Sequence, residues 1–337
     1  MSGIDPMKYK YAVYLKASDK NTYNITKFVE SLTWEDNEGE LAARISLQTK
    51  NEKTSAGWIH NLAKVGCWII IKHSYGSGDP KETVRGKIVE WNPTSGGGGR
   101  RFKAKAYDIL YDFQESSDNI YFSKGKKTKY IIKKVFKKWG IPLGKYTGAN
   151  VTHGKEIYRN KALGTFIFEL LKEAKTRGGK ESVPRAVQTK VCIIGVGTNK
   201  DVFKFSETRD ITEISHIIST VGMVTRVRII GQEKKKSKKT PVYATVNGKT
   251  EYGVRQKMYS KEKKESLKTA KKEAKQILVD EGSPKNEINI TTFDIPSVRK
   301  GDKIHLTSAT YTGNCIVKSV THNCEDHIMK MKVKKAK

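Results

Sequence analysis

Residues 287–333 decide the fold class of this chain: EINITTFDIPSVRKGDKIHLTSATYTGNCIVKSVTHNCEDHIMKMKV. Apolar and polar side chains alternate in four short runs, at 287–295, 302–308, 315–322 and 328–333. Alternation over about four to eight residues is typical of a strand with one buried face. Turn residues separate the runs, as at Gly301-Asp302. This part of the chain is therefore predicted to be a set of consecutive β-strands.

A stretch in the first half of the chain repeats the same order of features. Its pieces are KVGCWIII (64–71), VRGKIVEW (84–91) and RRFKAKAYD (100–108), against RKGDKIHL (299–306), TGNCIVKSV (312–320) and HIMKMKV (327–333). A basic residue and a glycine, Gly66 or Gly301, precede the first strand of each set. A second glycine, Gly86 or Gly313, opens the next strand with a slip of about one residue.

Within the first strands of the two sets, Ile69 matches Ile304 and Ile71 matches Leu306. The pattern alone leaves two interpretations open. The chain holds two related β-barrels separated by insertions, or it holds two unrelated three-stranded meanders.

The remaining sequence adds strands and a few helices. Short β-branched and aromatic runs fill residues 9–113, with a possible short helix at 55–64. Apolar residues at helical spacing predict helices over 128–139, 163–176 and 261–281. Ser260 is the expected N-cap of the last helix and Gly282 its end. Asn247-Gly248 predicts a two-residue hairpin turn.

The predicted fold class is therefore α+β, mainly β, with two barrels and helical insertions. MSGIDP is expected to precede the natural start at Met7 and is left out of the division. Four parts are predicted: a first barrel at 7–115, an α/β helical middle domain at 116–187, strands of the second barrel with a basic loop and a hairpin at 188–260, and the helix and closing strands of that barrel at 261–337.

Composition points to a charged partner. Lys and Arg number 65 and Asp and Glu 35, which gives a formal net charge of +30. Such an excess suits an anionic partner or an assembly that neutralises it. The cysteines fit no disulfide framework, so we expect free thiols from a reducing compartment: Cys67, Cys192, Cys315 and Cys324. No apolar run reaches the roughly 20 residues of a membrane span, and we expect no signal peptide.

Segments at both ends resemble a known family. SLKTAKKEAKQILVDEG (266–282), followed by INITTFDIPSVRKGDKIHL and GNCIVKSVTHNCEDHIMKMKV, resembles the closing part of phage tail-hub proteins of the late-control-protein type. EDNEGELAARISL (35–47), VRGKIVEW, KAKAYDILYDF and YFSKGKKTKYIIKKVF are similar to the XkdQ/YqbQ branch of that family, which occurs in defective prophages and phage-tail-like particles of Gram-positive bacteria. The resemblance runs from about residue 9 and is weakest at 232–260.

The resemblance implies a structural role. Such hubs form a homotrimer at the tip of a contractile phage tail or tail-like bacteriocin, where three chains with two barrels each join the sixfold tube to the threefold central spike. The implied partners are the tail tube, central spike, baseplate wedge and tape measure proteins. The implied location is the virion or particle tail baseplate, assembled in the bacterial host cytoplasm. No cofactor is implied. The residues that carry the fold resemblance are Gly66, Gly86, Gly301, Asp302, Gly313 and His322.

Candidate chemical sites are weak. His322, Cys324 and His327, with Cys315 nearby, are zinc-ligand types, but they lack the paired spacing of structural zinc modules. No nucleophile, zinc-protease or P-loop motif occurs, and adjacent carboxylates such as Glu35-Asp36 point to opposite faces of a strand. We therefore expect neither an enzyme nor a metal protein.

The segment GQEKKKSKKTP (231–241) invites a nucleic-acid interpretation. Its lysines are Lys234, Lys235, Lys236, Lys238 and Lys239. Single-strand binding requires aromatic residues among the basic ones, and none is interleaved with these lysines. No DNA-reading motif appears either. A charged loop that faces an acidic neighbour in an assembly is the preferred interpretation. A basic nucleic-acid-binding protein stays as the alternative, and a subunit of a cell-wall hydrolase as a weaker one.

Overall fold

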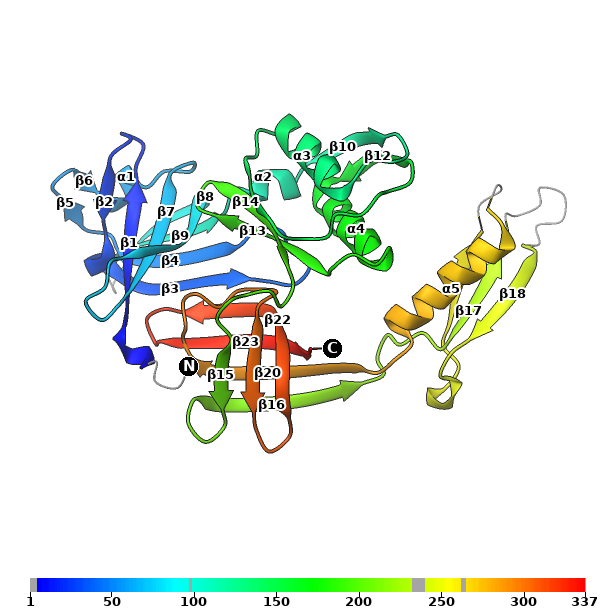
Figure 1. The fold of residues 1–337 in the computed structure, drawn as a ribbon. Helices are drawn as coiled ribbons and strands as arrows, with labels where there is room; N and C mark the ends of the chain where they lie inside the picture. Colours follow the sequence, from blue (N-terminus) through cyan, green and yellow to red (C-terminus); the bar gives the residue numbers. More distant parts are fainter. Residues whose placement is uncertain (1–4, 97–98, 232–239, 262–264, 337) are drawn as a thin grey trace. The chain divides into compact units, whose positions relative to one another are not determined.

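The computed structural model describes residues 5–96, 99–231, 240–261 and 265–336. The chain divides into two compact units, Met1–Ile214 with Asn289–Lys337 and Ser215–Ile288 (Figure 1). Strands make up 49% of the residues and helices 18%, so the predicted mainly β fold class is confirmed. All four cysteines are free and buried, as expected. No helix among the described residues is long and apolar enough to cross a membrane.

The first array of strands wraps around one apolar core. Its strands are hydrogen-bonded in the order β3-β4-β9-β8-β7-β1. They are β1 (Tyr9–Lys16), β3 (Val29–Asp36), β4 (Arg44–Lys50), β7 (Trp68–Tyr75), β8 (Lys81–Gly96) and β9 (Gly99–Tyr107). Every strand sends alternate side chains into a single buried cluster, for example Leu15, Trp34, Ile45, Ile69, Ile88 and Phe102. One core shared by all six strands is what a barrel-like closure requires.

The second array repeats the first in the order β16-β20-β23-β22-β21-β15. Its strands are β15 (Phe203–Ser206), β16 (Ile211–Ser219), β20 (Lys285–Phe293), β21 (Lys303–Thr307), β22 (Thr312–Asn323) and β23 (Ile328–Lys335). The sequence from β20 to β23 follows the same path as that from β4 to β9. One difference is that β15 pairs with β21 in parallel, whereas β1 pairs with β7 antiparallel.

Backbone details show that the repeat is real. Gly66 has φ of 90° and Gly301 has φ of 88°. The Gly66 N–H donates to the Ile88 carbonyl at 2.9 Å, and the Gly301 N–H donates to the Val317 carbonyl at 2.7 Å. A register shift follows in both arrays, between Ile88 and Glu90 and between Val317 and Ser319. The interpretation as two related barrels is therefore favoured over unrelated meanders.

The register also corrects one detail of the predicted match. Gly86 lies opposite Ile69, and the residue opposite the matching Ile304 is Cys315. Gly313 lies opposite Leu306, two residues away from the position of Gly86. The two glycines serve different purposes. A Cβ at Gly86 would come within 3.0 Å of the Ala106 backbone, whereas Gly313 has φ of 151°.

Unit 1 also contains the helical middle region. It holds β10 (Ser117–Phe122), α3 (Thr128–Lys138), β11 (Leu143–Tyr146), β12 (Glu156–Ala162), α4 (Leu163–Thr176), β13 (Ser182–Val187) and β14 (Lys190–Gly195). Both long helices were predicted, and α4 has the predicted bounds. The buried faces of α3 and α4 share one cluster through residues such as Ile132, Phe136, Phe166 and Leu170. The remaining short elements are β2 (Thr22–Asn24), β5 (Lys53–Thr54), β6 (Gly57–Trp58), α1 (Ile59–Leu62), α2 (Tyr111–Gln114), and the 3-10 turns Pro6–Lys8 and Thr26–Phe28.

Unit 2 is a three-stranded sheet with one helix, and it corrects two predictions. The sheet order is β18-β17-β19, from β17 (Arg226–Ile230), β18 (Val242–Asn247) and β19 (Gln256–Ser260). The two-residue hairpin at Asn247-Gly248 is wrong, because β18 and β19 lie on opposite sides of β17 and a 3-10 turn, Thr250–Tyr252, follows the glycine. The helix α5 (Leu267–Glu281) is packed on the sheet through Ala270 and Ala274.

The N-cap of α5 is Ser266, not Ser260, which ends β19. The Ser266 hydroxyl accepts the Thr269 N–H at 3.1 Å, which satisfies one of the free donors of the first turn. Unit 2 begins within β16 and ends within β20, and its three-stranded sheet and helix lie between these two strands in sequence. The matching place in the first array is the short connection from β3 to β4, so unit 2 is an insertion into a hairpin of the repeat. The four-part division of the chain remains a prediction.

Candidate assembly interface

The two arrays are joined inside the chain by the pairing of β22 with β3. The first part of β22 pairs with β21, and its last part pairs with β3. Val320 lies opposite Asp36, and His322 lies opposite Trp34. The His322 and Trp34 rings are stacked, with centroids 4.0 Å apart and an interplanar angle of 4°. The sheet of the second array is thus extended by β3, the end strand of the first array.

His322 is held by two acceptors in the core of this junction. Its Nδ1 lies 2.6 Å from Asp294 Oδ1, and its Nε2 lies 3.0 Å from the Val298 carbonyl oxygen. The Tyr11 hydroxyl donates to the other Asp294 oxygen. Both ring nitrogens are therefore occupied. Burial raises the pKa of the Cys324 thiol well above its ordinary value, which disfavours the thiolate that a metal needs. The arrangement is that of a structural histidine.

A buried ion network fixes the same junction. Asp36 is buried, with Arg299 Nη2 at 2.9 Å and Lys300 Nζ at 3.0 Å from its carboxylate oxygens. Burial alone raises the pKa of Asp36, but Lys300, Arg299 and the more distant Arg185 outweigh it and hold that pKa well below its usual range. The carboxylate on β3 therefore ties the first array to the segment that enters β21.

Hydrogen bonds to carbonyls complete the network. Lys300 Nζ also donates to the carbonyls of Asn37 and Glu40, at 2.9 Å and 2.7 Å. Asp302, a residue of the predicted fold motif, accepts from Arg185 Nη2 at 2.8 Å and from the Arg299 N–H at 2.8 Å. The turn at Gly301-Asp302 was predicted from the sequence. The roles of Asp36, Arg299 and Lys300 were not, because nothing in the sequence showed that Asp36 pairs with a segment about 260 residues away.

Two strand edges that match this junction have no further strand paired to them among the described residues. Beyond Ile88, the described part of β8 pairs with β9 on one side. The strand β16 ends the sheet order, with β20 as its neighbour in the described sheet. In the repeat, the end of β8 matches the part of β22 that takes up β3, and β16 matches β3. These two edges are the candidate interface.

Pro93 marks the open edge of β8. The Arg100 carbonyl accepts the Asn51 N–H, so Arg100 and Phe102 face away from β8 and Arg101 faces it. Thr94, opposite Arg101, therefore faces β9, and the Pro93 backbone faces away from β9. Proline cannot donate to a ladder and is therefore confined to edges. Trp91, two residues earlier, is half-buried against the first core, and its Nε1 donates to the His60 carbonyl at 3.0 Å.

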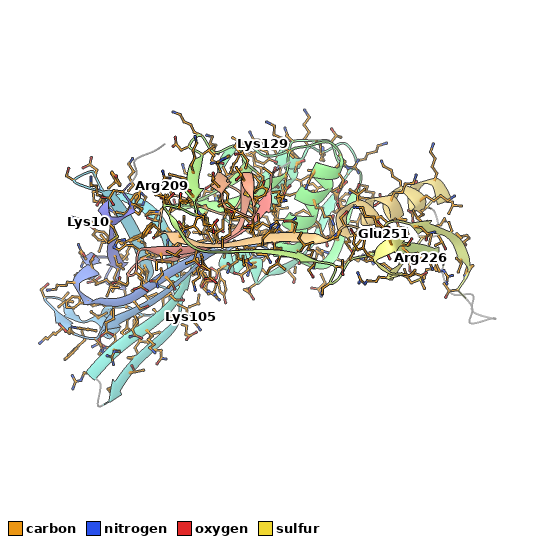
Figure 2. The ribbon with its side chains drawn as sticks, turned by 90° about the horizontal axis from the view of Figure 1, so that it is seen from below. Lys10, Lys105, Lys129, Arg209, Arg226 and Glu251 are labelled. Atoms are coloured by element: carbon orange, nitrogen blue, oxygen red, sulfur yellow. The ribbon has the colours of Figure 1, made fainter. Side chains whose placement is uncertain are left out.

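Charged side chains cover the surface of each unit. Lys10, Lys105, Lys129 and Arg209 all lie at the surface of unit 1 (Figure 2). Residues 119–155 hold ten lysines and no acidic residue, and the lysines of α3 lie on its exposed face. The predicted loop lysines 234–236, 238 and 239 lie outside the described residues. The exposed lysine face of α3 is thus the clearest basic surface among the residues that the structure describes.

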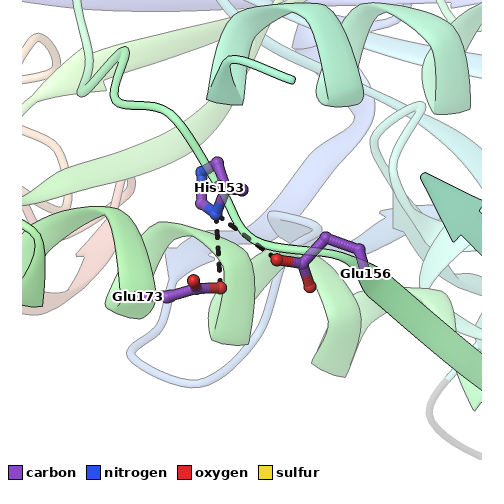
Figure 3. Close-up of side chains that lie close together, drawn as sticks. All are labelled: His153, Glu156 and Glu173. Carbon is purple, nitrogen blue, oxygen red and sulfur yellow. Dashed lines mark ion pairs between the residues drawn. The ribbon is translucent and has the colours of Figure 1, made fainter. Parts of the chain in front are cut away.

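Within the described residues, one group brings three potential metal ligands together: His153, Glu156 and Glu173 (Figure 3). It belongs to the helical middle region. This group was not predicted from the sequence, where the candidate ligands were His322, Cys324 and His327 near the C-terminus. The spacing of His153 and Glu156 was the available signal, but Glu173 comes from the next helix and only the fold brings it close.

The comparisons with known proteins agree with this architecture. Two tail proteins have solved structures similar over nearly their whole length. The 43 kDa tail protein of prophage MuSo2 from Shewanella oneidensis is 13% identical, with a TM-score of 0.68 over 96% of this chain and 98% of that one. The tail protein from Neisseria meningitidis MC58 is 14% identical, with a TM-score of 0.68 over 96% of each chain.

The c3393 protein of E. coli, described as a type VI secretion system component similar to the T4 tail proteins gp27 and gp5, is 9% identical. Its TM-score is 0.56 over 96% of this chain and 77% of that one. At these identities the likeness establishes the fold, which is the predicted tail-hub architecture. No curated protein sequence matches the chain. The model of the YQBQ-like family matches residues 32–334, and the chain belongs to that family.

Proposed function

We propose that this protein is the structural hub of a contractile phage tail or tail-like particle and that it acts as a homotrimeric ring. The observation that carries the proposal is the internal repeat, together with the β22–β3 junction. Family membership and the tail-protein fold support it. The role involves no catalysis.

The geometry of one chain supplies the rule for closing the ring. Inside the chain, the end strand of the first array, β3, adds to the free part of β22. The corresponding end strand of the second array is β16, and the corresponding free part of the first array is β8 beyond Ile88. Applying the same contact between copies places β16 of one copy against β8 of the next. Such a head-to-tail contact closes into a ring when the rotation allows.

Three chains with two arrays each would then present six similar barrels around a common axis. A ring of this kind matches a sixfold tube on one face while keeping threefold symmetry for a central spike. It also removes the exposed strand edges that otherwise promote aggregation. Pro93 costs this contact one hydrogen bond relative to β22–β3, because His322, the matching residue, has an N–H where Pro93 has none.

The remaining parts of the chain suit contacts with other baseplate proteins. The lysine face of α3 fits an acidic neighbour, and unit 2 offers exposed apolar side chains such as Val242, Tyr243 and Met258. We propose that these parts contact the spike and wedge proteins of the baseplate and that the tape measure protein passes through the lumen of the ring.

Cysteine cross-linking tests the ring contact directly. Thr94→Cys on β8 is combined in turn with cysteine at Thr212, Glu213 and Ile214 on β16, since the native cysteines are all buried. The protein is produced with its tail partners, oxidised and separated without reductant. We expect one pair to give a covalent trimer. Thr94→Cys combined with Thr22→Cys, on the other end strand β2, is the matched control and should stay monomeric. Absence of any cross-linked species, with particles assembled, would contradict the proposed contact.

A further inference from the structure

Three side chains from separate segments of the middle region converge on one point (Figure 3). His153 lies in the connection before β12, Glu156 is the first residue of β12, and Glu173 lies on α4. His153 Nδ1 is 3.2 Å from Glu173 Oε2 and 3.6 Å from Glu156 Oε1. The three ligand atoms all lie within 4.8 Å of one another. His153 and Glu156 are buried and Glu173 is half-buried.

Thr128 sets the orientation of the histidine. The Thr128 hydroxyl oxygen accepts the Val151 N–H at 3.2 Å and lies 3.2 Å from the Val151 carbonyl oxygen, to which it can donate. Its remaining lone pair faces His153 Nε2 at 2.8 Å. When the hydroxyl donates its hydrogen to that carbonyl, Nε2–H is the donor to Thr128. The lone pair of Nδ1 is then directed at the two carboxylates, and this buried atom has no hydrogen-bond partner.

The carboxylates are held by their other oxygens. The Tyr158 hydroxyl donates to Glu156 Oε2 at 2.9 Å, and Arg177 Nε donates to Glu173 Oε1 at 2.5 Å. The oxygens left over, Glu156 Oε1 and Glu173 Oε2, are the two that face Nδ1. In metal sites, neighbouring residues regularly hold a ligand side chain by hydrogen-bonding the polar atom that does not bind the metal.

We propose that His153, Glu156 and Glu173 form a binding site for a divalent transition-metal ion, with Zn²⁺ as the reference ion. A metal with bonds of about 2.0–2.2 Å to nitrogen and oxygen separates tetrahedral ligands by roughly 3.3–3.6 Å. The 3.6 Å distance from Nδ1 to Glu156 Oε1 lies at the upper end of that range, and the 3.2 Å distance to Glu173 Oε2 lies about 0.1 Å below it. An imidazole ligand favours Zn²⁺ and its neighbours over Mg²⁺ and Ca²⁺. The ion clamps the segment before β12 to α4, and a water molecule completes its coordination. This site is independent of the ring contact.

The competing occupant of the same space is a proton on Nδ1, which would give an imidazolium between two carboxylates. The two cases differ in stoichiometric metal binding and in the state of Nδ1. Glu169, exposed on the same helix as Glu173 and paired with Lys161, provides a matched control because it lies outside the group.

The test uses the full chain after treatment with a chelator. Zn²⁺ is titrated by calorimetry, and bound metal is measured after desalting. We expect one Zn²⁺ per chain, at least 10-fold weaker binding in Glu173→Gln and His153→Gln, and unchanged binding in Glu169→Gln. If a variant fails to fold, the visible spectrum of Co²⁺ bound to the unaltered chain should show nitrogen and oxygen ligation at one site per chain. Sub-stoichiometric metal, or ¹⁵N NMR of His153 with hydrogens on both ring nitrogens in the presence of Zn²⁺, would overturn the assignment.

Discussion

Replacing Asp36 by Asn tests the energetic claim about the junction between the two arrays. The change keeps the shape of the side chain and removes its charge, so Arg299 and Lys300 lose the carboxylate that lies 2.9 Å and 3.0 Å away. Removing one partner of a buried ion pair costs about 3–5 kcal/mol, because the opposite charge stays buried. Arg299 keeps the Ala186 carbonyl and Lys300 keeps two carbonyls, so we expect the lower end, about 3 kcal/mol.

The neighbouring residue provides the control. Glu35 pairs with Arg44 near the surface of the same strand, with 18% and 34% of the side chains exposed. An ion pair near the surface contributes about 0–1 kcal/mol, so Glu35→Gln should cost much less than Asp36→Asn.

Tryptophan fluorescence suits the measurement in urea, because all five tryptophans lie in unit 1. Equal free energies of unfolding for Asp36→Asn and Glu35→Gln would show that the buried carboxylate does not stabilise the junction. The lowered pKa of Asp36 also sets how its contribution to stability changes with pH. Since the pKa of Asp36 is lowered in the folded protein, its contribution is present above about pH 4 and is lost as the pH falls further. The difference between Asp36→Asn and the unaltered chain should therefore shrink in acid.

Three further predictions concern other features of unit 1. Gly66→Ala should lower the free energy of unfolding by about 1–2 kcal/mol, because the backbone at Gly66 is left-handed. Gly301→Ala should lower it by about 1–3 kcal/mol more, because its Cβ would lie 2.6 Å from Val183 Cγ2, whereas a Cβ at Gly66 meets nothing within 4 Å; equal urea midpoints for the two variants would contradict this. Burial raises the pKa of Asp108 to about 6, so the folded chain keeps the proton of this carboxyl to a higher pH than the unfolded chain does. The stability of the unaltered chain relative to Asp108→Asn should therefore fall by up to about 3 kcal/mol as the pH rises from about 4 to 6, and a stability difference that does not change with pH would exclude this. Replacing Lys133, Lys134 and Lys137 on α3 by Ser should leave the free energy of unfolding unchanged and weaken DNA binding at low salt, and we expect even the unaltered chain to lose DNA binding at about 0.2 M salt. Nanomolar, sequence-dependent DNA binding at about 0.2 M salt would favour the nucleic-acid alternative.

Local patterns predicted the elements that local physics controls. The helices at 128–138 and 163–176 have apolar faces at regular spacing, and their ends follow from nearby residues. The repeat was visible because glycine and the alternating apolar residues recur in the same order around Gly66 and Gly301. The start of α5 was misplaced, since Ser260 and Ser266 are both acceptable N-caps and pairing with β17 draws Ser260 into a strand.

The long-range features could not be predicted in this way. Pairing of β3 with β22 joins residues nearly 300 positions apart, and no local signal distinguishes Asp36 from its neighbour Glu35. The hairpin at Asn247-Gly248 failed for a related reason: β17 offers two edges, and the strand after the turn took the second edge. The group of His153, Glu156 and Glu173 likewise depends on α4 folding back over the start of β12.

Imaging of assembled tail tips that contain this protein would show whether it forms the proposed ring. We expect three copies in one ring at the end of the tube, with six similar barrels and β16 of each copy beside β8 of the next. A tip in which the protein is a single copy, or in which copies meet through surfaces other than these two strand edges, would contradict it.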